Sequence, residues 1–255
     1  MRSSSKYLPS PLHRRGLIAF FALLIIWMLS PLAPAVNLTI PADANIFGAG
    51  HAVPPAPGGG GAGELPPEFD LSFTAGTGLV LIFTSVTGSV IVDSGSGNHV
   101  NDPDGVGSAS GINVNSFDGI SGTIANTAGF LAGVFLGASE PTDPAPLRLD
   151  FTMIGTSFTS LSPQLDQVFF IGDGLTGDGT GSIQQFNVPT GATRLILGFA
   201  DAPNYQGDPG GYGDNTGSFS ATFSIVPEPS VSALLFSGAG LGVLVGRRVI
   251  RVIRG

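Results

Sequence analysis

The chain has 255 residues, with 18 acidic against 10 basic residues and no cysteine, which excludes disulfides, thiolate-bound zinc and cysteine nucleophiles. Most basic residues lie near the two ends, so residues 36–225 hold only Arg148 and Arg194 against seventeen acids, a net formal charge of −15. Because phosphate binding requires clustered Lys and Arg, nucleic acid is excluded as a plausible partner, and an anionic polymer is disfavoured unless a divalent cation lies between.

Residues 1–35 have the layout of a secretory signal peptide. A basic segment without acids precedes an apolar run over residues 16–29, and Ala33-Pro34-Ala35 has the small-x-small form of a signal-peptidase site. The apolar run is shorter than the ~18–20 residues that span a bilayer. We therefore expect a signal helix that signal peptidase cleaves near Ala35; a retained membrane anchor is the alternative.

Residues 54–67 read PPAPGGGGAGELPP, a low-complexity stretch of proline and glycine. Such a composition buries too little apolar area to offset its ordering entropy. It predicts a flexible surface insertion.

Residues 36–225 have the periodicity of strands and are long enough for one domain. Runs rich in Val, Ile, Phe and Thr alternate with Gly, Asp, Asn and Pro, and no capped helical pattern appears between them. Two half-buried sheets packed face to face are the usual solution for many short strands. We therefore predict an all-β fold, a jelly-roll-like β-sandwich. The expected strands include residues 78–92, 130–136, 147–154, 167–171, 194–199 and 218–225.

Residues 172–181, GDGLTGDGTG, are similar to the glycine-aspartate turns of calcium-binding solenoids. Those proteins repeat the motif several times, whereas it occurs once here. A hairpin loop is the favoured interpretation.

Residues 211–219, GYGDNTGSF, place an acid and an amide side by side on a glycine-flanked loop before a strand. One interpretation is a simple turn, because Asp, Asn and Gly favour turns. The other is a calcium site, since calcium takes six to eight oxygen ligands from carboxylates, amides and carbonyls.

The stretch from residue 168 to residue 223 resembles the C-terminal half of the PA-I-type galactose-binding calcium lectins, most specifically at YGDNTGSF after a strand-end acid. The resemblance implies a β-sandwich of the galactose-binding type with calcium held by Asp201, the backbone carbonyl of Gly211, and the adjacent side chains of Asp214 and Asn215. A carbonyl from a distant loop completes the protein ligands in that family, and sugar hydroxyls fill the remaining positions. Because the loop after Asp201 is longer here, Asp208 is the alternative first ligand.

Two further comparisons with these lectins concern the sugar and the aromatic residues. The nearest match to the family's sugar-reading stretch is Asp102-Pro103-Asp104-Gly105. Tyr212 and Tyr205 are expected to pack rather than to stack on a sugar.

His51 and His99 are the histidines of the predicted domain. Neither has a matching nucleophile or a carboxylate pair at a suitable spacing, so both are expected to be solvated loop residues. The chain is therefore not expected to be an enzyme.

Three features follow one another at the C-terminal end. Pro227-Glu228-Pro229 comes first, an apolar segment over residues 231–246 follows as an expected transmembrane helix, and a cluster of arginines comes last. This order resembles the PEP-CTERM sorting signal of Gram-negative envelope proteins. The resemblance implies that residues 226–255 pass transiently through the inner membrane and are processed by an exosortase. An ordinary tail anchor is the alternative.

Together these features predict an exported cell-surface or extracellular-matrix protein that binds carbohydrate or exopolysaccharide through calcium. A structural component of the biofilm matrix without a working metal or sugar site is the alternative function.

Overall fold

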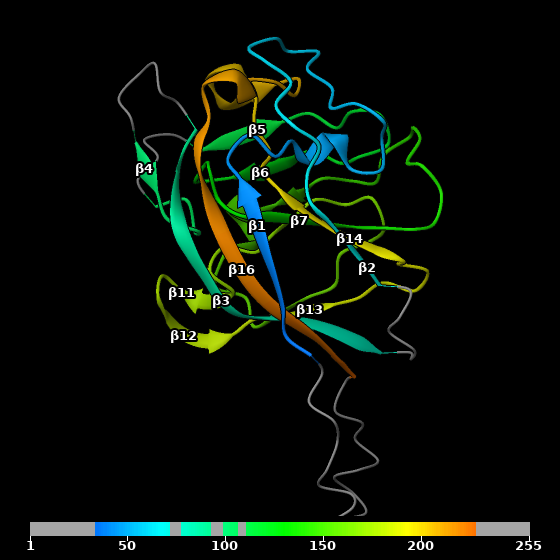
Figure 1. The fold of residues 1–255 in the computed structure, drawn as a ribbon, viewed down its shortest axis with the longest axis vertical. Helices are drawn as coiled ribbons and strands as arrows, with labels where there is room; N and C mark the ends of the chain where they lie inside the picture. The colour runs from blue at the N-terminus through cyan, green and yellow to red at the C-terminus, as the bar shows by residue number, and fades with distance from the viewer. Residues whose placement is uncertain (1–33, 72–77, 93–98, 107–110, 228–255) are drawn as a thin grey trace, which may run out of the picture. The chain divides into compact units, whose positions relative to one another are not determined.

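The computed structural model describes residues 34–71, 78–92, 99–106 and 111–227 (Figure 1). The chain divides into two compact units, residues 1–33 and residues 34–255, and every described residue belongs to the second. Within the described residues, strands and loops account for nearly all of the chain, with one α-helical turn and three 3-10 turns. The predicted all-β class is confirmed.

The larger sheet has the strand order β1-β16-β3-β13-β9, and β4 pairs with the C-terminal end of β3. Figure 1 shows the long strands β3 and β16 lying side by side, in antiparallel register. Burial alternates along the middle of β16, because Phe219, Ala221 and Phe223 are buried whereas Ser220 and Thr222 between them are partly exposed; Ser224 is buried as well. The bounds are β1 (Val36–Pro41), β3 (Leu79–Ile91), β4 (Val100–Asn101), β9 (Ser160–Leu161), β13 (Gln185–Asn187) and β16 (Thr216–Pro227).

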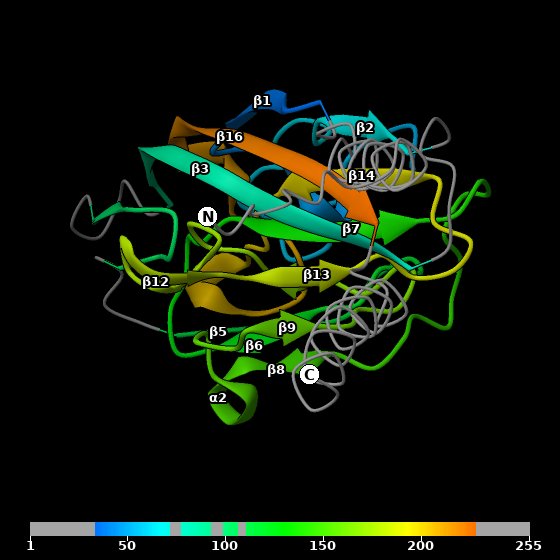
Figure 2. The same ribbon diagram turned by 90° about the horizontal axis from the view of Figure 1, so that it is seen from below.

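A second sheet has the order β10-β7-β14-β2 and packs against the first through phenylalanines. The rings of Phe69 and Phe223 lie 5.3 Å apart edge to face, and Phe169 and Phe186 also lie 5.3 Å apart. Each pair joins one residue from each sheet, so the core lies between the two sheets (Figure 2). The bounds are β2 (Glu68–Asp70), β7 (Ala132–Leu136), β10 (Phe169–Phe170) and β14 (Arg194–Gly198).

Two smaller sheets and several short turns complete the described chain. Residues 172–181 form the hairpin that the sequence predicts, because β11 and β12 pair antiparallel across them. A four-stranded sheet has the order β15-β5-β6-β8. The bounds are β5 (Ile112–Val114), β6 (Thr123–Ala125), β8 (Leu149–Asp150), β11 (Leu175–Gly177), β12 (Thr180–Ile183), β15 (Gln206–Gly207), η1 (Ile46–Gly48), η2 (Pro203–Tyr205) and η3 (Tyr212–Asp214).

The prediction of a strand over residues 147–154 is wrong for the second half of this range. β8 ends at Asp150, and α2 (Phe151–Ile154) follows as a single helical turn. The side chain of Asp150 accepts a hydrogen bond from the N–H of Thr152, and Gly155 ends the turn with a φ of 76°. An N-cap acid and a C-terminal glycine are sufficient local reasons for a turn that strand periodicity does not reveal.

The proline- and glycine-rich segment 54–67 has more contacts than its composition led us to expect. Its residues 58–61 make four backbone hydrogen bonds with residues 209–213, and the buried side chain of Asn45 donates to two of its carbonyls. Glycine permits this close approach, since a Cβ on Gly61 would lie 2.6 Å from a backbone nitrogen of the other loop. The segment is therefore joined to the domain along its length by backbone pairing rather than by apolar burial.

The predicted signal peptide up to residue 33 and the predicted membrane segment 231–246 lie outside the described residues. None of the helical turns in the part of the chain that the structure describes is long and apolar enough to cross a membrane. The last described strand, β16, ends at Pro227, so Glu228 and Pro229 of the sorting motif also lie outside.

Candidate metal centre

Asp201 lies three residues after β14, at the position that the sequence predicts for a strand-end carboxylate. Its side chain is almost completely buried, with 3% exposed. Its Oδ1 accepts a hydrogen bond from the N–H of Ala202 at 2.8 Å, and its Oδ2 accepts one from Nδ2 of Asn215 at 3.0 Å. A buried carboxylate needs such partners, because desolvation of its charge is otherwise costly.

Tyr212 fixes the second loop of the site against the end of β14. Its hydroxyl donates to the carbonyl of Phe199 at 2.9 Å and accepts from the N–H of Asp201 at 3.1 Å. Burial and the neighbouring Asp201 charge raise the pKa of Tyr212 well above its ordinary value, so the phenol stays protonated. The expectation that Tyr212 packs rather than stacks on a ligand is confirmed, since its side chain is 1% exposed.

Asn215 brings three segments of the chain to one point. It follows η3 directly and precedes β16, and its Nδ2 donates both to Asp201 and to the carbonyl of Ala42, at 3.0 and 3.2 Å. Its Oδ1 is buried and has no hydrogen-bond partner among the described residues. An unpaired buried amide oxygen costs about 1–3 kcal/mol, which makes this atom the weakest point of the arrangement.

Half a turn of the Asn215 amide about its Cβ–Cγ bond exchanges the positions of Nδ2 and Oδ1. In that orientation the amide oxygen faces Oδ2 of Asp201 and the carbonyl oxygen of Ala42, the two atoms that Nδ2 now contacts. Three oxygens around one point repel one another unless a cation lies between them. Carboxylate, amide and backbone carbonyl oxygens are the ligands that calcium takes in proteins.

Gly211 lies beside the carboxylate as expected. A Cβ at this position would be 3.5 Å from Cγ of Asp201, and the φ of 86° is in the left-handed region that favours glycine. The N–H of Gly211 donates to the carbonyl of Gly59, so the glycine-rich segment holds the loop at this point.

Asp214 and Asp208 are not part of the contact between Asp201 and Asn215. The side chain of Asp214 is exposed and makes no hydrogen bond or ion pair with other described residues. Oδ1 of Asp208 accepts from Nδ2 of Asn115 at 2.9 Å. Of the two alternatives for the first ligand, Asp201 is therefore the one placed against Asn215.

The lectin resemblance implies a carbonyl from a distant loop, but the sequence does not identify Ala42 as its source. A backbone carbonyl has no sequence signature, and Ala42 lies 173 positions from Asn215 in the chain. No group of three or more His, Asp or Glu side chains within the described ranges is placed to hold a metal ion. The set around Asp201 differs from such a group, since an amide and a carbonyl accompany a single carboxylate.

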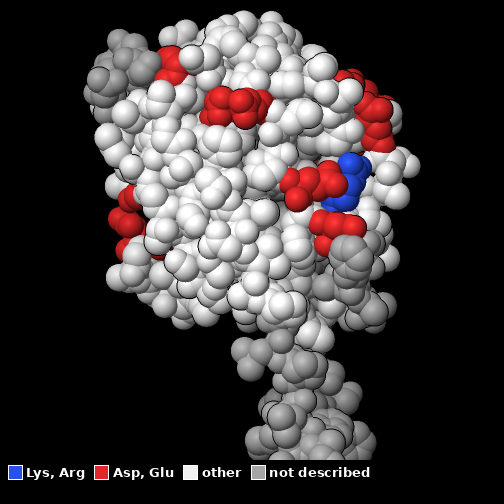
Figure 3. Space-filling view, in the orientation of Figure 1, with Lys and Arg blue, Asp and Glu red and all other residues white. Residues whose placement is uncertain are grey.

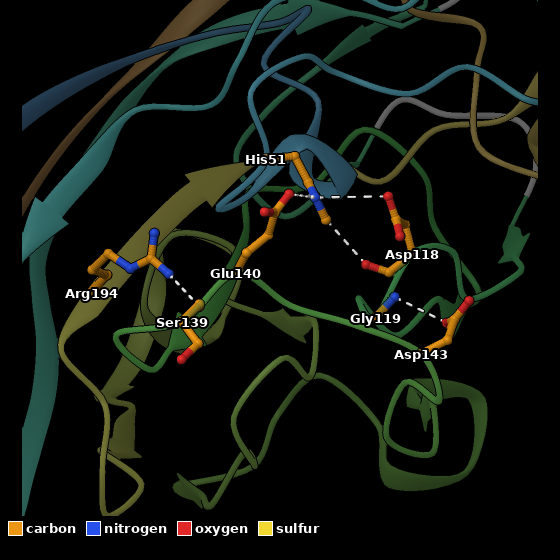
Figure 4. Close-up of polar contacts among 7 residues, drawn as sticks. All are labelled: His51, Asp118, Gly119, Ser139, Glu140, Asp143 and Arg194. Atoms are coloured by element: carbon orange, nitrogen blue, oxygen red, sulfur yellow. Dashed lines mark hydrogen bonds and ion pairs between the residues drawn. The ribbon is translucent and has the colours of Figure 1, made fainter.

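The prediction that His51 is a solvated loop residue is wrong. Only 7% of it is exposed; Nδ1 lies 2.9 Å from Oε1 of Glu140, and Nε2 lies 3.0 Å from the carbonyl oxygen of Asp118 (Figure 4). Gly119 donates to Asp143 in the same region, at 3.0 Å. His51 therefore links the segment after η1 to two other loops, a structural role.

Asp102 and Asp104 stabilise a loop away from Asp201. They lie in the segment compared above with the sugar-reading stretch of the lectins. Oδ1 of Asp102 accepts from the N–H groups of Asp104 and Val106, and Oδ1 of Asp104 accepts from the N–H of Asp173. Burial, together with repulsion from Asp173 and other acids, raises the pKa of Asp104 to about 6. These contacts join residues 102–106 to the β11–β12 hairpin.

Comparison of the chain with protein-family models, with curated proteins and with solved structures found no match.

Proposed function

We infer that this chain is an exported envelope or extracellular-matrix protein whose β-sandwich domain binds carbohydrate through calcium. The observation that carries this proposal is the convergence of Asp201 and the Ala42 carbonyl on the amide of Asn215, whose buried Oδ1 has no partner. After half a turn of that amide, a calcium ion at this point would be the partner of Oδ1 and would offset the repulsion among the three oxygens.

The proposed ligand set extends from this point to the neighbouring loop. Asp201, Asn215 and the Ala42 carbonyl hold the ion first, and the carbonyl of Gly211 and the exposed carboxylate of Asp214 join after local movement. Calcium takes six to eight oxygens, so this set leaves positions open for two hydroxyls of a sugar. The exposure of Asp214 supports an open site, since a ligand can approach from that side.

Carbohydrate is the partner that fits the charge of the domain. Acidic side chains lie in several separate groups on the face shown in Figure 3, with basic atoms in one place only. A neutral or calcium-bridged glycan can approach such a surface, whereas a polyanion without bound cations is repelled. The resemblance of residues 168–223 to the PA-I-type lectins, whose β-sandwich is of the galactose-binding type, supports the same ligand class.

Calcium titration by calorimetry and by melting temperature tests the metal site. Millimolar calcium should release or absorb heat and raise the melting temperature of the protein, since a ligand that binds only the folded state stabilises it. Asp201→Asn should abolish both effects. Asp208→Asn is the matched control, because Asp208 bonds to Asn115 instead and should leave the calcium response unchanged.

The second candidate function is a structural matrix protein with the same fold and no working site. The observation that favours it is the direct hydrogen bond from Asn215 to Asp201, which closes the site without an ion. No calcium response in the unchanged protein would favour this candidate.

The route of export is the second part of the proposal. It is supported by the order Pro227-Glu228-Pro229, apolar segment 231–246 and terminal arginines, which resembles the exosortase-processed signal. Replacing the three motif residues with alanine should leave the protein in the inner membrane of its Gram-negative host, measured by cell fractionation. Normal release of that variant would contradict the proposal.

A further inference from the structure

A pocket of about 310 Å³ opens in the described domain at a place that shares no residue with the Asp201 site. Four loops and turns form it: the loop after β4, the loop after β6, the region of α2 and the β11–β12 hairpin. Pockets that hold small ligands begin at about 300 Å³, so this one has room for a single small molecule and not for a chain.

The base of the pocket is aromatic. Phe151 and Phe170 both line it, with 2% and 1% of their surfaces exposed, and their ring centroids lie 5.8 Å apart. Because almost none of either ring is accessible, the two rings close the pocket from below and fix its shape, and they offer a ligand little surface of their own.

The rim of the pocket is polar, and several of its donors and acceptors are not paired with other described residues. Asp178, Ser157 and Asn126 line it, and their side chains make no hydrogen bond with other described residues. Thr127 and Thr176 also line it, but their hydroxyls are used, by the carbonyl of Gly105 and by the N–H of Ser182 respectively. The unused groups combine carboxylate acceptors with hydroxyl and amide donors, a mixture that matches vicinal hydroxyl groups.

The charge around the pocket excludes an anionic ligand. Asp104 and Asp178 line it, Asp102 and Asp173 lie close enough to raise the pKa of Asp104, and no arginine or lysine is among the lining residues. A phosphate, a sulfate or a uronic acid would be repelled at this position.

We propose that this pocket binds one neutral sugar residue without calcium, seated above the buried Phe151 and Phe170 with its hydroxyls on Asp178, Ser157 and Asn126. The proposal does not depend on the Asp201 site. Together with the calcium site proposed above, it would make the protein bivalent for glycans, with one calcium-dependent and one calcium-independent site in one domain. Two sites of this kind would allow one molecule to crosslink polysaccharide chains.

Saturation-transfer NMR with galactose, glucose, mannose and N-acetylglucosamine tests the proposal. The full chain is used, in a detergent whose headgroup is not a sugar, and a chelator removes calcium throughout. At least one of the four sugars should show transfer, and Ser157→Trp should abolish it by filling the pocket from an exposed position. Asp178→Asn should weaken binding about tenfold, since a hydrogen bond to a charged group is lost.

Ser139→Trp is the matched control, because Ser139 is also exposed and does not line the pocket. Transfer that Ser139→Trp also abolishes, transfer that survives Ser157→Trp, or transfer from none of the four sugars would overturn the proposal. Binding of glucosamine or another amine, with no binding of the neutral sugars, would overturn the assignment of a neutral ligand. A protein that does not respond to calcium at Asp201 would give the same outcomes in this experiment. The two proposals can therefore be refuted independently.

Discussion

The domain has two acidic regions built from loops, one around Asp201 and one around Asp104, and the carboxylates have different surroundings in each. Around Asp201 a single buried carboxylate meets the amide of Asn215, and that amide also reaches the carbonyl of Ala42, which lies 173 positions away in the chain. Around Asp104 two carboxylates, Asp104 and Asp178, line a pocket, and Asp102 and Asp173 lie close enough to repel Asp104 although backbone N–H groups bond to some of these oxygens. The first arrangement is organised around one point, as a metal ion requires, whereas the second surrounds an open volume, as a small molecule requires.

We expect the largest loss of stability from a substitution at Gly63, where the glycine-rich segment packs against the Asp201 region. A Cβ on Gly63 would lie 2.2 Å from the carbonyl oxygen of Asp43 and 2.8 Å from Cβ of Tyr212, at a φ of 67°. Gly63→Ala should therefore lower the free energy of unfolding by about 3 kcal/mol or more, measured by urea unfolding.

Gly137→Ala is the control for this clash, because its Cβ would meet nothing closer than 3.7 Å. We expect it to change the free energy of unfolding by less than about 1 kcal/mol. Equal effects of the two substitutions would mean that the packing of the glycine-rich segment against the site does not matter.

Tyr212→Phe should have the next largest effect. It removes the hydroxyl that bonds to the Phe199 carbonyl and to the Asp201 N–H, and both of these groups are buried. The loss should be about 2 kcal/mol in the free energy of unfolding, because the buried N–H of Asp201 loses its acceptor, whereas the carbonyl of Phe199 keeps the N–H of Ile46 as a donor. An unchanged urea midpoint would show that Tyr212 does not hold the loop at the strand end.

Asp104→Asn should have a smaller, opposite and pH-dependent effect. Burial, with repulsion from Asp173, Asp102 and Asp178, raises the pKa of Asp104 from 3.8 to about 6 in the folded protein. Between these two pH values the folded state binds more protons than the unfolded state, so the free energy of unfolding falls as the pH rises from about 4 to about 6. The lower value then persists at neutral pH.

The asparagine has no charge to desolvate and can still accept from the N–H of Asp173. The variant should be more stable than the unchanged protein at pH 7 by about 1 kcal/mol, a figure reduced for the screening of a partly exposed group. At pH 4 the two proteins should be nearly equal. A variant that is less stable at pH 7, by urea unfolding, would contradict the account of this region.

The sequence predicts the strands better than it predicts the loops. The alternation in β16 follows from burial of one face and can be read directly, and the β11–β12 hairpin follows from its turn residues. The helical turn α2 was missed because its Asp150 cap acts over only four residues. Short elements of this kind give no periodic signal.

The candidate site could be predicted only in part, for a related reason. Asp201 and Asn215 are visible as a strand-end acid and an amide before a strand, and the structure places them in contact. The Ala42 carbonyl and the pairing of residues 58–61 with the second loop depend on contacts distant in sequence and on the backbone, which no side-chain pattern records. The burial of His51 between two loops was missed for the same reason.

A crystal structure of the domain grown with millimolar calcium tests the central proposal most directly. We predict an ion within about 2.3–2.6 Å of Oδ2 of Asp201, the Ala42 carbonyl oxygen and Oδ1 of Asn215, with the Asn215 amide turned toward it. Anomalous scattering would identify the ion as calcium. An unoccupied site in which Nδ2 of Asn215 still donates to Asp201, or calcium bound at Asp104 and Asp173 instead, would contradict it.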